Sequence, residues 1–263
     1  MNIITCIKQV PASSNVKVDP ITGVLIRDGQ NVKMNPFDLF GIEMACSIKD
    51  QQENVNVHAI TMGPPSATQV LNEALYMGAD DATLISDRKF AGADVLATSY
   101  TISQLIKHIG NYDLIICGKQ TTDGDTAQVG PEVAEFLSIP HVPYVHEILK
   151  VNQDSVTVRS SYETYEEIIT VKLPCLITID KDVNTPRLPS YRRRLQFNQY
   201  PIPMVTLKDL SDTNEKNYGL NGSPTQVDEI YAPDKTMESH LISGTSDDLA
   251  KKIIDVLKES RYL

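Results

Sequence analysis

The sequence predicts an α/β protein in which a parallel sheet is covered by helices on both faces. Three observations support this fold class. Short apolar runs of strand length alternate with stretches of helical periodicity through the first half of the chain. The connections between these runs are short, which favours repeated strand–helix units. Beyond Pro140 the alternation ends, and three runs typical of antiparallel strands follow.

The first strand–helix unit begins at the N-terminus. Residues 3–7 form an apolar run that predicts a strand rather than a signal peptide. Residues 16–28 (VKVDPITGVLIRD) hold two short alternating runs, which indicate a hairpin. Apolar residues recur with helical spacing over residues 37–48. Asn35 followed by Pro36 fits an N-cap with proline in the first helical position.

Strands and helices continue in alternation after this unit. A glycine, Gly78, closes the first of the next two helices, as is common at helix C-termini. The predicted strands are residues 55–62, 82–86 and 114–117, and the predicted helices are residues 66–77 and 94–109. In such a fold, ligands bind beyond the carboxyl ends of the strands.

The second half of the chain predicts an extension of the sheet and a long tail. Three antiparallel strands are expected at residues 142–149, 155–161 and 166–171, with one more buried strand at residues 175–179. From Asn184 the chain reads as irregular, with several prolines and a basic run of three arginines. A polar stretch leads from there to the final helix.

An amphipathic helix is expected from about Ser246 to the end, with Leu249, Ile253 and Leu257 on one stripe. Such a helix either covers a partner surface or folds back on its own domain, and the sequence leaves both open. The complete prediction is a Rossmann-like parallel sheet covered by helices on both faces. It carries a small antiparallel extension and a C-terminal arm ending in a helix.

The bulk composition excludes several function classes. The formal net charge is −10, which disfavours a nucleic-acid partner. No apolar run approaches the length of a membrane span, so no membrane insertion is expected. The cysteines form no CxxC pair, which predicts buried thiols in a reducing cytoplasm and no metal site. They are Cys6, Cys46, Cys117 and Cys175.

The stretch CGKQTTDGDTAQVGPEVAEFL, residues 117–137, raises the question of what it binds. A strand, a short glycine-bearing loop and a helix N-terminus often hold a nucleotide. However, the loop carries Asp123 and Asp125, which repel phosphate, and it lacks a lysine after its second glycine. The chain also lacks the GxxxxGK[ST], GxGxxG and GxSxG patterns.

Several interpretations of the acidic loop remain open from its residues alone. The carboxylates of Asp123 and Asp125 can cap the following helix or bind ribose hydroxyls, while the amides of residues 124–128 face a phosphate. A metal-dependent hydrolase built on the two carboxylates is a further hypothesis. No histidine or cysteine nearby in the sequence completes such a site. A stand-alone, stress-type ATP-binding α/β domain is another alternative.

A series of motifs runs through the chain in the order CIKQVP, MNPFD, ITMGPPSA, GADDATLISD, GKQTTDGDTAQVGP, LPCLIT and NTPR. In this series the chain resembles the beta (small) subunit of electron-transfer flavoproteins over nearly its whole length. DGDTAQVGP is the most specific of these motifs. ITMGPPSA, NTPR and GLNGSP most resemble the electron-bifurcating members of anaerobic bacteria. The chain departs from the family pattern at residues 160–164, where an acidic and glycine-rich turn is usual.

The resemblance implies a heterodimer with an alpha subunit that carries one FAD. The beta subunit then holds AMP in ordinary members and a second FAD in bifurcating members. It implies a nucleotide-binding domain at residues 1–183, a partner-recognition loop at 184–200 and an arm at 201–263 that contacts the alpha subunit. The residues expected to contact the nucleotide are Cys6, Lys8, Asn35, Pro36, Phe37, Asp38, Met62, Gly63, Gly118, Lys119, Gln120, Thr121, Thr122, Asp123, Gly124, Asp125, Thr126, Ala127, Gln128 and Val129.

The function implied is that of an electron carrier subunit in an NADH-oxidising complex. In the bifurcating version, the FAD takes a hydride from NADH. One electron goes to ferredoxin and the other passes through the alpha-subunit FAD to a dehydrogenase. The dehydrogenase is expected to be an acyl-CoA dehydrogenase or a flavin-linked lactate dehydrogenase. The alternative is a non-bifurcating subunit with structural AMP. No residue is expected to act as a general acid or base, because the redox chemistry belongs to the flavin.

Overall fold

The computed structural model describes residues 1–12, 17–18, 25–26, 32–228 and 241–263. Of the hairpin predicted at 16–28, two short antiparallel strands are described, and the remainder lies outside the described residues. These strands are β3 (Lys17–Val18) and β4 (Leu25–Ile26). The chain divides into two compact units, Met1–Asp228 and Glu229–Leu263.

A nine-stranded sheet forms the centre of the first unit, in the order β11-β10-β9-β12-β8-β1-β6-β7-β13. The strands from β12 to β13 in this order all run parallel, which confirms the predicted fold class. Their bounds are β1 (Asn2–Cys6), β6 (Asn56–Met62), β7 (Asp81–Ile85), β8 (Leu114–Gly118), β12 (Cys175–Ile179) and β13 (Met204–Val205). A separate antiparallel pair joins β2 (Gln9–Pro11) to β5 (Val32–Met34).

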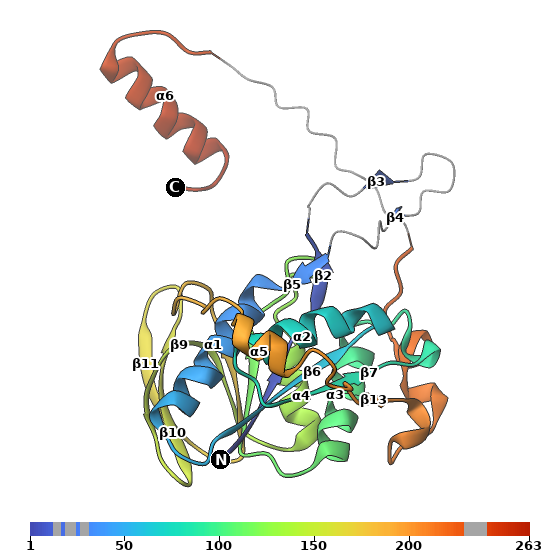
Figure 1. The fold of residues 1–263 in the computed structure, drawn as a ribbon. Coiled ribbons are helices and arrows are strands. Elements are labelled where there is room, and N and C mark those ends of the chain that lie inside the picture. Colours follow the sequence, from blue (N-terminus) through green and yellow to red (C-terminus); the bar gives the residue numbers. More distant parts are fainter. Residues whose placement is uncertain (13–16, 19–24, 27–31, 229–240) are drawn as a thin grey trace. The chain divides into compact units, whose positions relative to one another are not determined.

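Helices cover both faces of the sheet, as expected (Figure 1). Neighbouring residues Ile3 and Ile4 of β1 belong to different hydrophobic clusters, because successive side chains on a strand point to opposite faces. Leu71 packs in the first cluster and Leu105 in the second. The helices behind the first cluster are α1 (Pro36–Gln51) and α2 (Thr68–Met77), and those behind the second are α3 (Val95–Ile109) and α4 (Val129–Leu137).

The order of the strands reverses at β1. Along the chain, β6 pairs with one edge of β1, and β7 then pairs with β6. The next strand, β8, pairs with the other edge of β1. At such a switch point the connections leave toward opposite faces, and a crevice opens at the carboxyl ends of the two central strands. The crevice of this fold is therefore expected beyond Cys6 and Gly118.

The antiparallel extension consists of β9 (His141–Val151), β10 (Ser155–Ser161) and β11 (Glu166–Lys172). β10 pairs antiparallel with both of its neighbours, as predicted. The prediction was incomplete for β9, because this strand also pairs parallel with β12. β9 therefore joins the antiparallel extension to the parallel part of the sheet.

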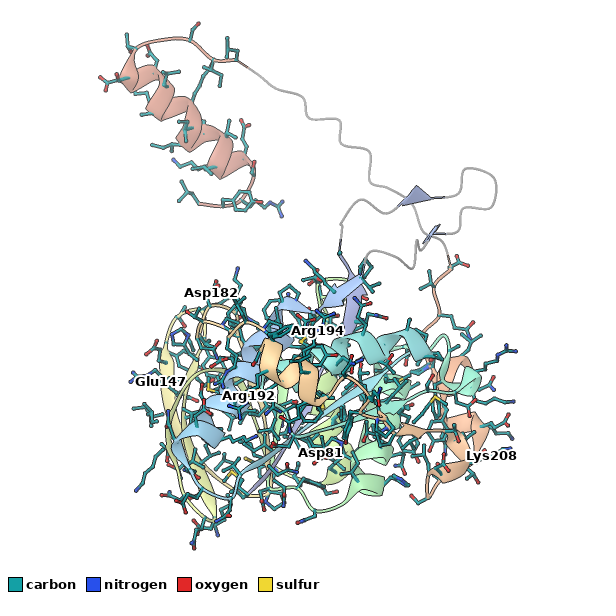
Figure 2. All side chains as sticks on the ribbon, viewed as in Figure 1. Asp81, Glu147, Asp182, Arg192, Arg194 and Lys208 are labelled. Carbon is teal, nitrogen blue, oxygen red and sulfur yellow. The ribbon has the colours of Figure 1, made fainter. Side chains whose placement is uncertain are left out.

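The stretch after Asn184 contains more regular structure than its prolines suggest. Ser190 caps a short helix, α5 (Tyr191–Gln196), by accepting a hydrogen bond from the backbone N–H of Arg193. The exposed side chains of Arg192 and Arg194 belong to this helix (Figure 2). Single turns of 3-10 helix are η1 (Pro65–Ala67), η2 (Arg88–Phe90), η3 (Leu207–Asp209), η4 (Glu215–Asn217) and η5 (Gly219–Gly222).

In the second unit, the amphipathic helix predicted from Ser246 is observed as α6 (Ser246–Glu259). Thr245 and Asp248 form a capping box at its start, which fixes the first residue of the helix. Ile253 and Val256 are more than half exposed on its surface. Among the described residues, no helix is long and apolar enough to cross a membrane.

Candidate functional site

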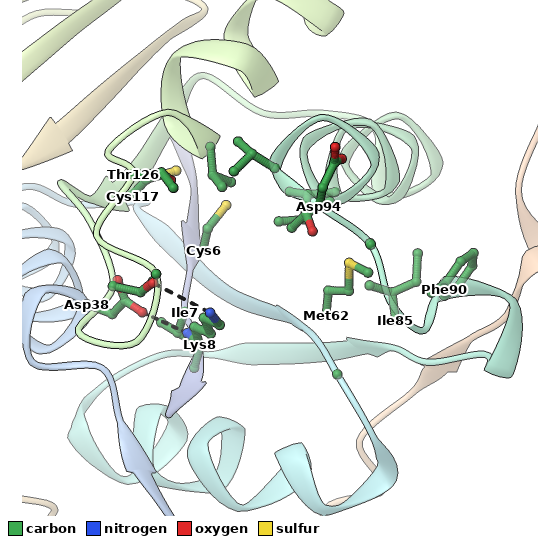
Figure 3. A pocket seen from close by; sticks show the side chains of 18 of the residues that line it. Cys6, Ile7, Lys8, Asp38, Met62, Ile85, Phe90, Asp94, Cys117 and Thr126 are labelled. Carbon is green, nitrogen blue, oxygen red and sulfur yellow. Dashed lines mark hydrogen bonds between the residues drawn. The ribbon is translucent and has the colours of Figure 1, made fainter. Parts of the chain in front are cut away.

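A cavity of about 740 Å³ lies at the carboxyl ends of β8, β1, β6 and β7 (Figure 3). Its lining comes from the segments that follow these four strands, together with Asp38 of α1. Neighbouring strands are about 4.8 Å apart, so four strands span about 14 Å. The cavity, called the slot below, thus extends over the ends of four strands at the switch point of the sheet.

Lys8, two residues beyond the end of β1, neutralises one of the two loop carboxylates. Its Nζ lies 2.7 and 2.8 Å from the carboxylate oxygens of Asp123. Burial raises the pKa of Asp123, but the bonds from Lys8 and Thr121 outweigh burial and leave the pKa below its usual value. Asp123 is therefore held as an anion by Lys8 and lies outside the lining of the cavity.

The second loop carboxylate, Asp125, braces the turn. Its Oδ1 accepts a hydrogen bond of 3.0 Å from the side chain of Gln120, and its backbone N–H donates to Thr121 O at 2.9 Å. Its backbone has the left-handed φ of 51°. The helix cap considered for these carboxylates is not formed, because the N-cap of α4 is Gln128, without a side-chain cap bond. The two anionic groups thus stabilise the loop itself.

Asn35 has a different role from the predicted helix cap. It stands at the N-cap position of α1, but its side chain makes no cap hydrogen bond. The side-chain Nδ2 donates to Gln120 O at 2.9 Å, and Oδ1 accepts from the N–H of Thr122 at 3.2 Å. Asn35 is fully buried, so both bonds are shielded from water. The start of α1 is in this way fastened to the acidic loop.

Asp38 provides a buried carboxyl group at the floor of the cavity. Its Oδ2 accepts a hydrogen bond of 2.7 Å from the backbone N–H of Lys8 (Figure 3). Burial raises the pKa of Asp38 from its ordinary value of 3.8 to about 7, against the hydrogen bonds that it accepts. A Cβ on Gly118 would lie 2.2 Å from Asp38 Oδ1, so this close approach requires glycine.

The structure brings most of the expected nucleotide contacts together around one cavity. Six of them lie outside the lining, in the supporting layer or in the turn: Asn35, Pro36, Phe37, Thr122, Asp123 and Asp125. The fourteen that line it are Cys6, Lys8, Asp38, Met62, Gly63, Gly118, Lys119, Gln120, Thr121, Gly124, Thr126, Ala127, Gln128 and Val129.

A second wall of the cavity was not predicted from the sequence. It consists of residues 85–88 and 90–95, at the end of β7 and after it, together with Thr98 and Ile102 of α3. This wall offers apolar surface, including Ile85 and Phe90 (Figure 3). The motif GADDATLISD ends at Asp87, and the stretch RKFAGAD that follows it carries none of the quoted motifs. The signal that was available is topological, because a strand next to β6 ends at the same edge of the sheet.

Cys6 and Cys117 stand opposite each other on β1 and β8 and both line the cavity. Two causes raise the pKa of the Cys117 thiol: the larger is a hydrogen bond with Cys6 and the next is burial. The thiol therefore stays protonated. The predicted buried, unbridged thiols are found at Cys46, Cys117 and Cys175, and Cys6 is half-buried. Within the described ranges, no group of three or more metal-ligating side chains lies close together.

The fold and the cavity define a doubly wound α/β protein with a ligand-sized slot at its switch point. The electron transfer flavoprotein domain family matches residues 22–210. An electron transfer flavoprotein subunit beta from Clostridium acetobutylicum is 41% identical over the full length of both chains. One from Megasphaera elsdenii is 40% identical over 98% of this chain and 97% of its own.

A third relative is the caffeyl-CoA reductase-Etf complex subunit CarD of Acetobacterium woodii. It is 41% identical over the full length of both chains. The chain described here therefore belongs to the electron transfer flavoprotein family, among the beta subunits, and its function lies in electron transfer.

Proposed function

We propose that this chain is the beta subunit of an electron-bifurcating flavoprotein and that its cavity binds FAD. Its alpha subunit carries a further FAD. NADH is the electron donor, and ferredoxin and a partner dehydrogenase are the two acceptors. The observation that carries the proposal is the second wall, which extends the cavity beyond the acidic loop. A mononucleotide has one base, one sugar and one phosphate to place, whereas a dinucleotide uses the whole slot.

The residues of the cavity are suited to a dinucleotide with a charged centre and flat ends. The N-terminus of α4 and the loop amides that follow Asp125 offer N–H donors to a diphosphate, whereas the N–H groups of Gly124 and Asp125 donate to Thr121 O within the turn. Thr126 lines the cavity and adds a hydroxyl group (Figure 3). Met62, Ile85 and Phe90 offer apolar surface to a ring system. The donor set and a lining that comes from four strand ends thus suit a dinucleotide such as FAD.

A bound FAD would supply hydride acceptance and one-electron transfer, chemistry that the side chains of the chain lack. The protein has the tasks of binding and orienting the group and of setting the charge around it. Asp38 is a carboxyl group that can keep its proton near neutral pH at the floor of the cavity. Lys8 is compensated by Asp123, so the loop brings little net charge to a diphosphate.

We also propose that residues 184–200 contact the partner dehydrogenase, an acyl-CoA dehydrogenase or a flavin-linked lactate dehydrogenase. Leu188, Tyr191 and Leu195 are 87%, 73% and 62% exposed in this segment. Exposed apolar side chains next to arginines are typical of contact surfaces between proteins. The guanidinium of Arg187 anchors the segment to α1 through two hydrogen bonds to Glu43 of 2.8 and 3.0 Å.

The nucleotide content of the co-purified heterodimer tests the proposed function. We expect two FAD per heterodimer, and NADH oxidation that requires ferredoxin and a dehydrogenase acceptor together. One FAD with one AMP, and no ferredoxin-dependent oxidation of NADH, would contradict the bifurcating function. That result would identify the slot as a structural AMP site.

A further inference from the structure

A segment far along the chain holds the second wall of the cavity in place through hydrogen bonds and packing. Residues 204–225 run behind the wall and contact it at several points. Leu220 N–H donates to Ala91 O at 3.1 Å, and Ser86 N–H donates to Val205 O at 2.9 Å. The ring of Tyr218, fully buried, packs against Phe90 with centroids 5.4 Å apart.

The contacts are densest at the turn that leads into α3. Asp94 caps this helix by accepting a bond of 3.0 Å from the N–H of Ala97. The other carboxylate oxygen accepts two bonds from Thr225, from the backbone N–H at 3.0 Å and from the hydroxyl at 2.7 Å. The hydroxyl of Ser223 accepts a bond of 2.8 Å from Asp94 N–H.

Residues 218–225, called the clamp below, hold the wall through their contacts with residues 89–94. The backbone of the clamp leaves little room for adjustment. Gly219 has a φ of +54°, and a Cβ there would lie 2.1 Å from Lys89 O. Gly92 has a φ of +73° and lies against Leu220. At Gly219 the two chain segments approach more closely than a side chain would permit, and at Gly92 the positive φ favours glycine. The path of the wall is therefore set jointly with that of residues 218–225.

We infer that Ser223 and Thr225 are positioning residues for the second half of a dinucleotide. They fix Asp94 and the adjoining wall, so that the slot stays open to its full length. The wall lies across the slot from the acidic loop, so that a mononucleotide bound at the loop amides would not depend on it. The clamp thus selects FAD over AMP, and this selection rests on the proposed function of the cavity.

The affinity ratio of FAD to AMP tests this inference in the full-length chain paired with its alpha subunit, after removal of bound nucleotide. In the double variant Ser223→Ala with Thr225→Val, we expect FAD affinity to fall about tenfold, the effect of one or two lost hydrogen bonds. AMP affinity is expected to stay within about twofold. The single variant Thr225→Ser keeps both hydroxyl groups and should bind FAD within about twofold of the wild type.

The matched control is Thr213→Val, because Thr213 is exposed in the same segment and makes no side-chain hydrogen bond within the described residues. It should leave both affinities unchanged. An equal fall for FAD and AMP, or unchanged FAD affinity, would overturn the clamp and leave the proposed function intact. A wild-type protein that binds AMP but no FAD would instead overturn the proposed function, and the clamp with it.

Discussion

At the scale of single residues, the buried carboxyl group of Asp38 makes the stability of the folded protein depend on pH. Its pKa is about 7 in the folded protein, against an ordinary value of 3.8. The folded state therefore binds the proton more tightly than the unfolded chain. The resulting stability is fully present below about pH 4 and is lost as the pH rises through about 7.

We expect the unfolding free energy of the wild type to fall by up to about 4 kcal/mol across this pH window through Asp38 alone, since a difference of one in pKa corresponds to about 1.36 kcal/mol. Asp38→Asn lacks the titrating group, so its stability should fall less steeply. Urea denaturation of both proteins at several pH values measures the two slopes. Parallel curves would show that Asp38 titrates normally.

Thr126 and Asp125 are neighbouring residues of the acidic loop whose side chains have different surroundings. Thr126 lines the cavity, whereas Asp125 is bonded within the turn. We therefore expect Thr126→Val to weaken nucleotide binding about tenfold and Asp125→Asn to change it less than about threefold. Isothermal titration with FAD and with AMP measures both. If Asp125→Asn alone emptied the cavity, the bracing role of this carboxylate would be wrong.

At the scale of elements, a largely buried ion pair helps to hold the segment before α5 against α1. The carboxylate of Glu43 is 10% exposed and binds the guanidinium of Arg187. Burial raises the pKa of Glu43, but the bonds and charge of Arg187 outweigh burial and lower it. Removal of the arginine leaves this buried anion without its partner.

We expect Arg187→Met to lower the unfolding free energy by about 3 kcal/mol at neutral pH. Arg192→Met is the control, because Arg192 is an exposed arginine of α5 and should change stability by less than about 0.5 kcal/mol. Chemical denaturation compares the two variants. Equal stabilities would mean that the ion pair of Arg187 contributes nothing to the segment.

At the scale of the whole molecule, the chain consists of two units that differ in how far their apolar side chains are buried. The unit Met1–Asp228 has both hydrophobic clusters, whereas α6 shows exposed Ile253, Ile254 and Val256. An apolar row that stays exposed on a helix is typical of a surface that binds another protein.

Removal of residues 229–263 should therefore leave a chain that unfolds cooperatively and binds nucleotide within about threefold of the wild type, because the cavity lies in the first unit. The shortened chain should no longer co-purify with the alpha subunit. Ile253→Asn in the full chain separates the helix surface from chain length. Continued pairing by the shortened chain would show that α6 is not required for it.

The sequence by itself determined the alternation of strands and helices, the loop at residues 118–130 and the first residue of α6. These features are local, because hydrophobic periodicity and capping residues act over a few positions. The motifs also predicted fourteen of the residues that line the cavity, but not those of its second wall. The short helix α5 was not predicted, since one and a half turns carry little periodicity among prolines.

Only the tertiary structure decided how the carboxylates of the site are used. Lys8 meets Asp123 across 115 residues, Asn35 meets Gln120 across 85, and Thr225 meets Asp94 across 131. Such pairs depend on the order of strands in the sheet and on the path of the tail behind it, which no local pattern encodes. The acidic loop is therefore compatible with a nucleotide because distant residues neutralise and brace it, and the second wall exists because residues 204–225 hold it.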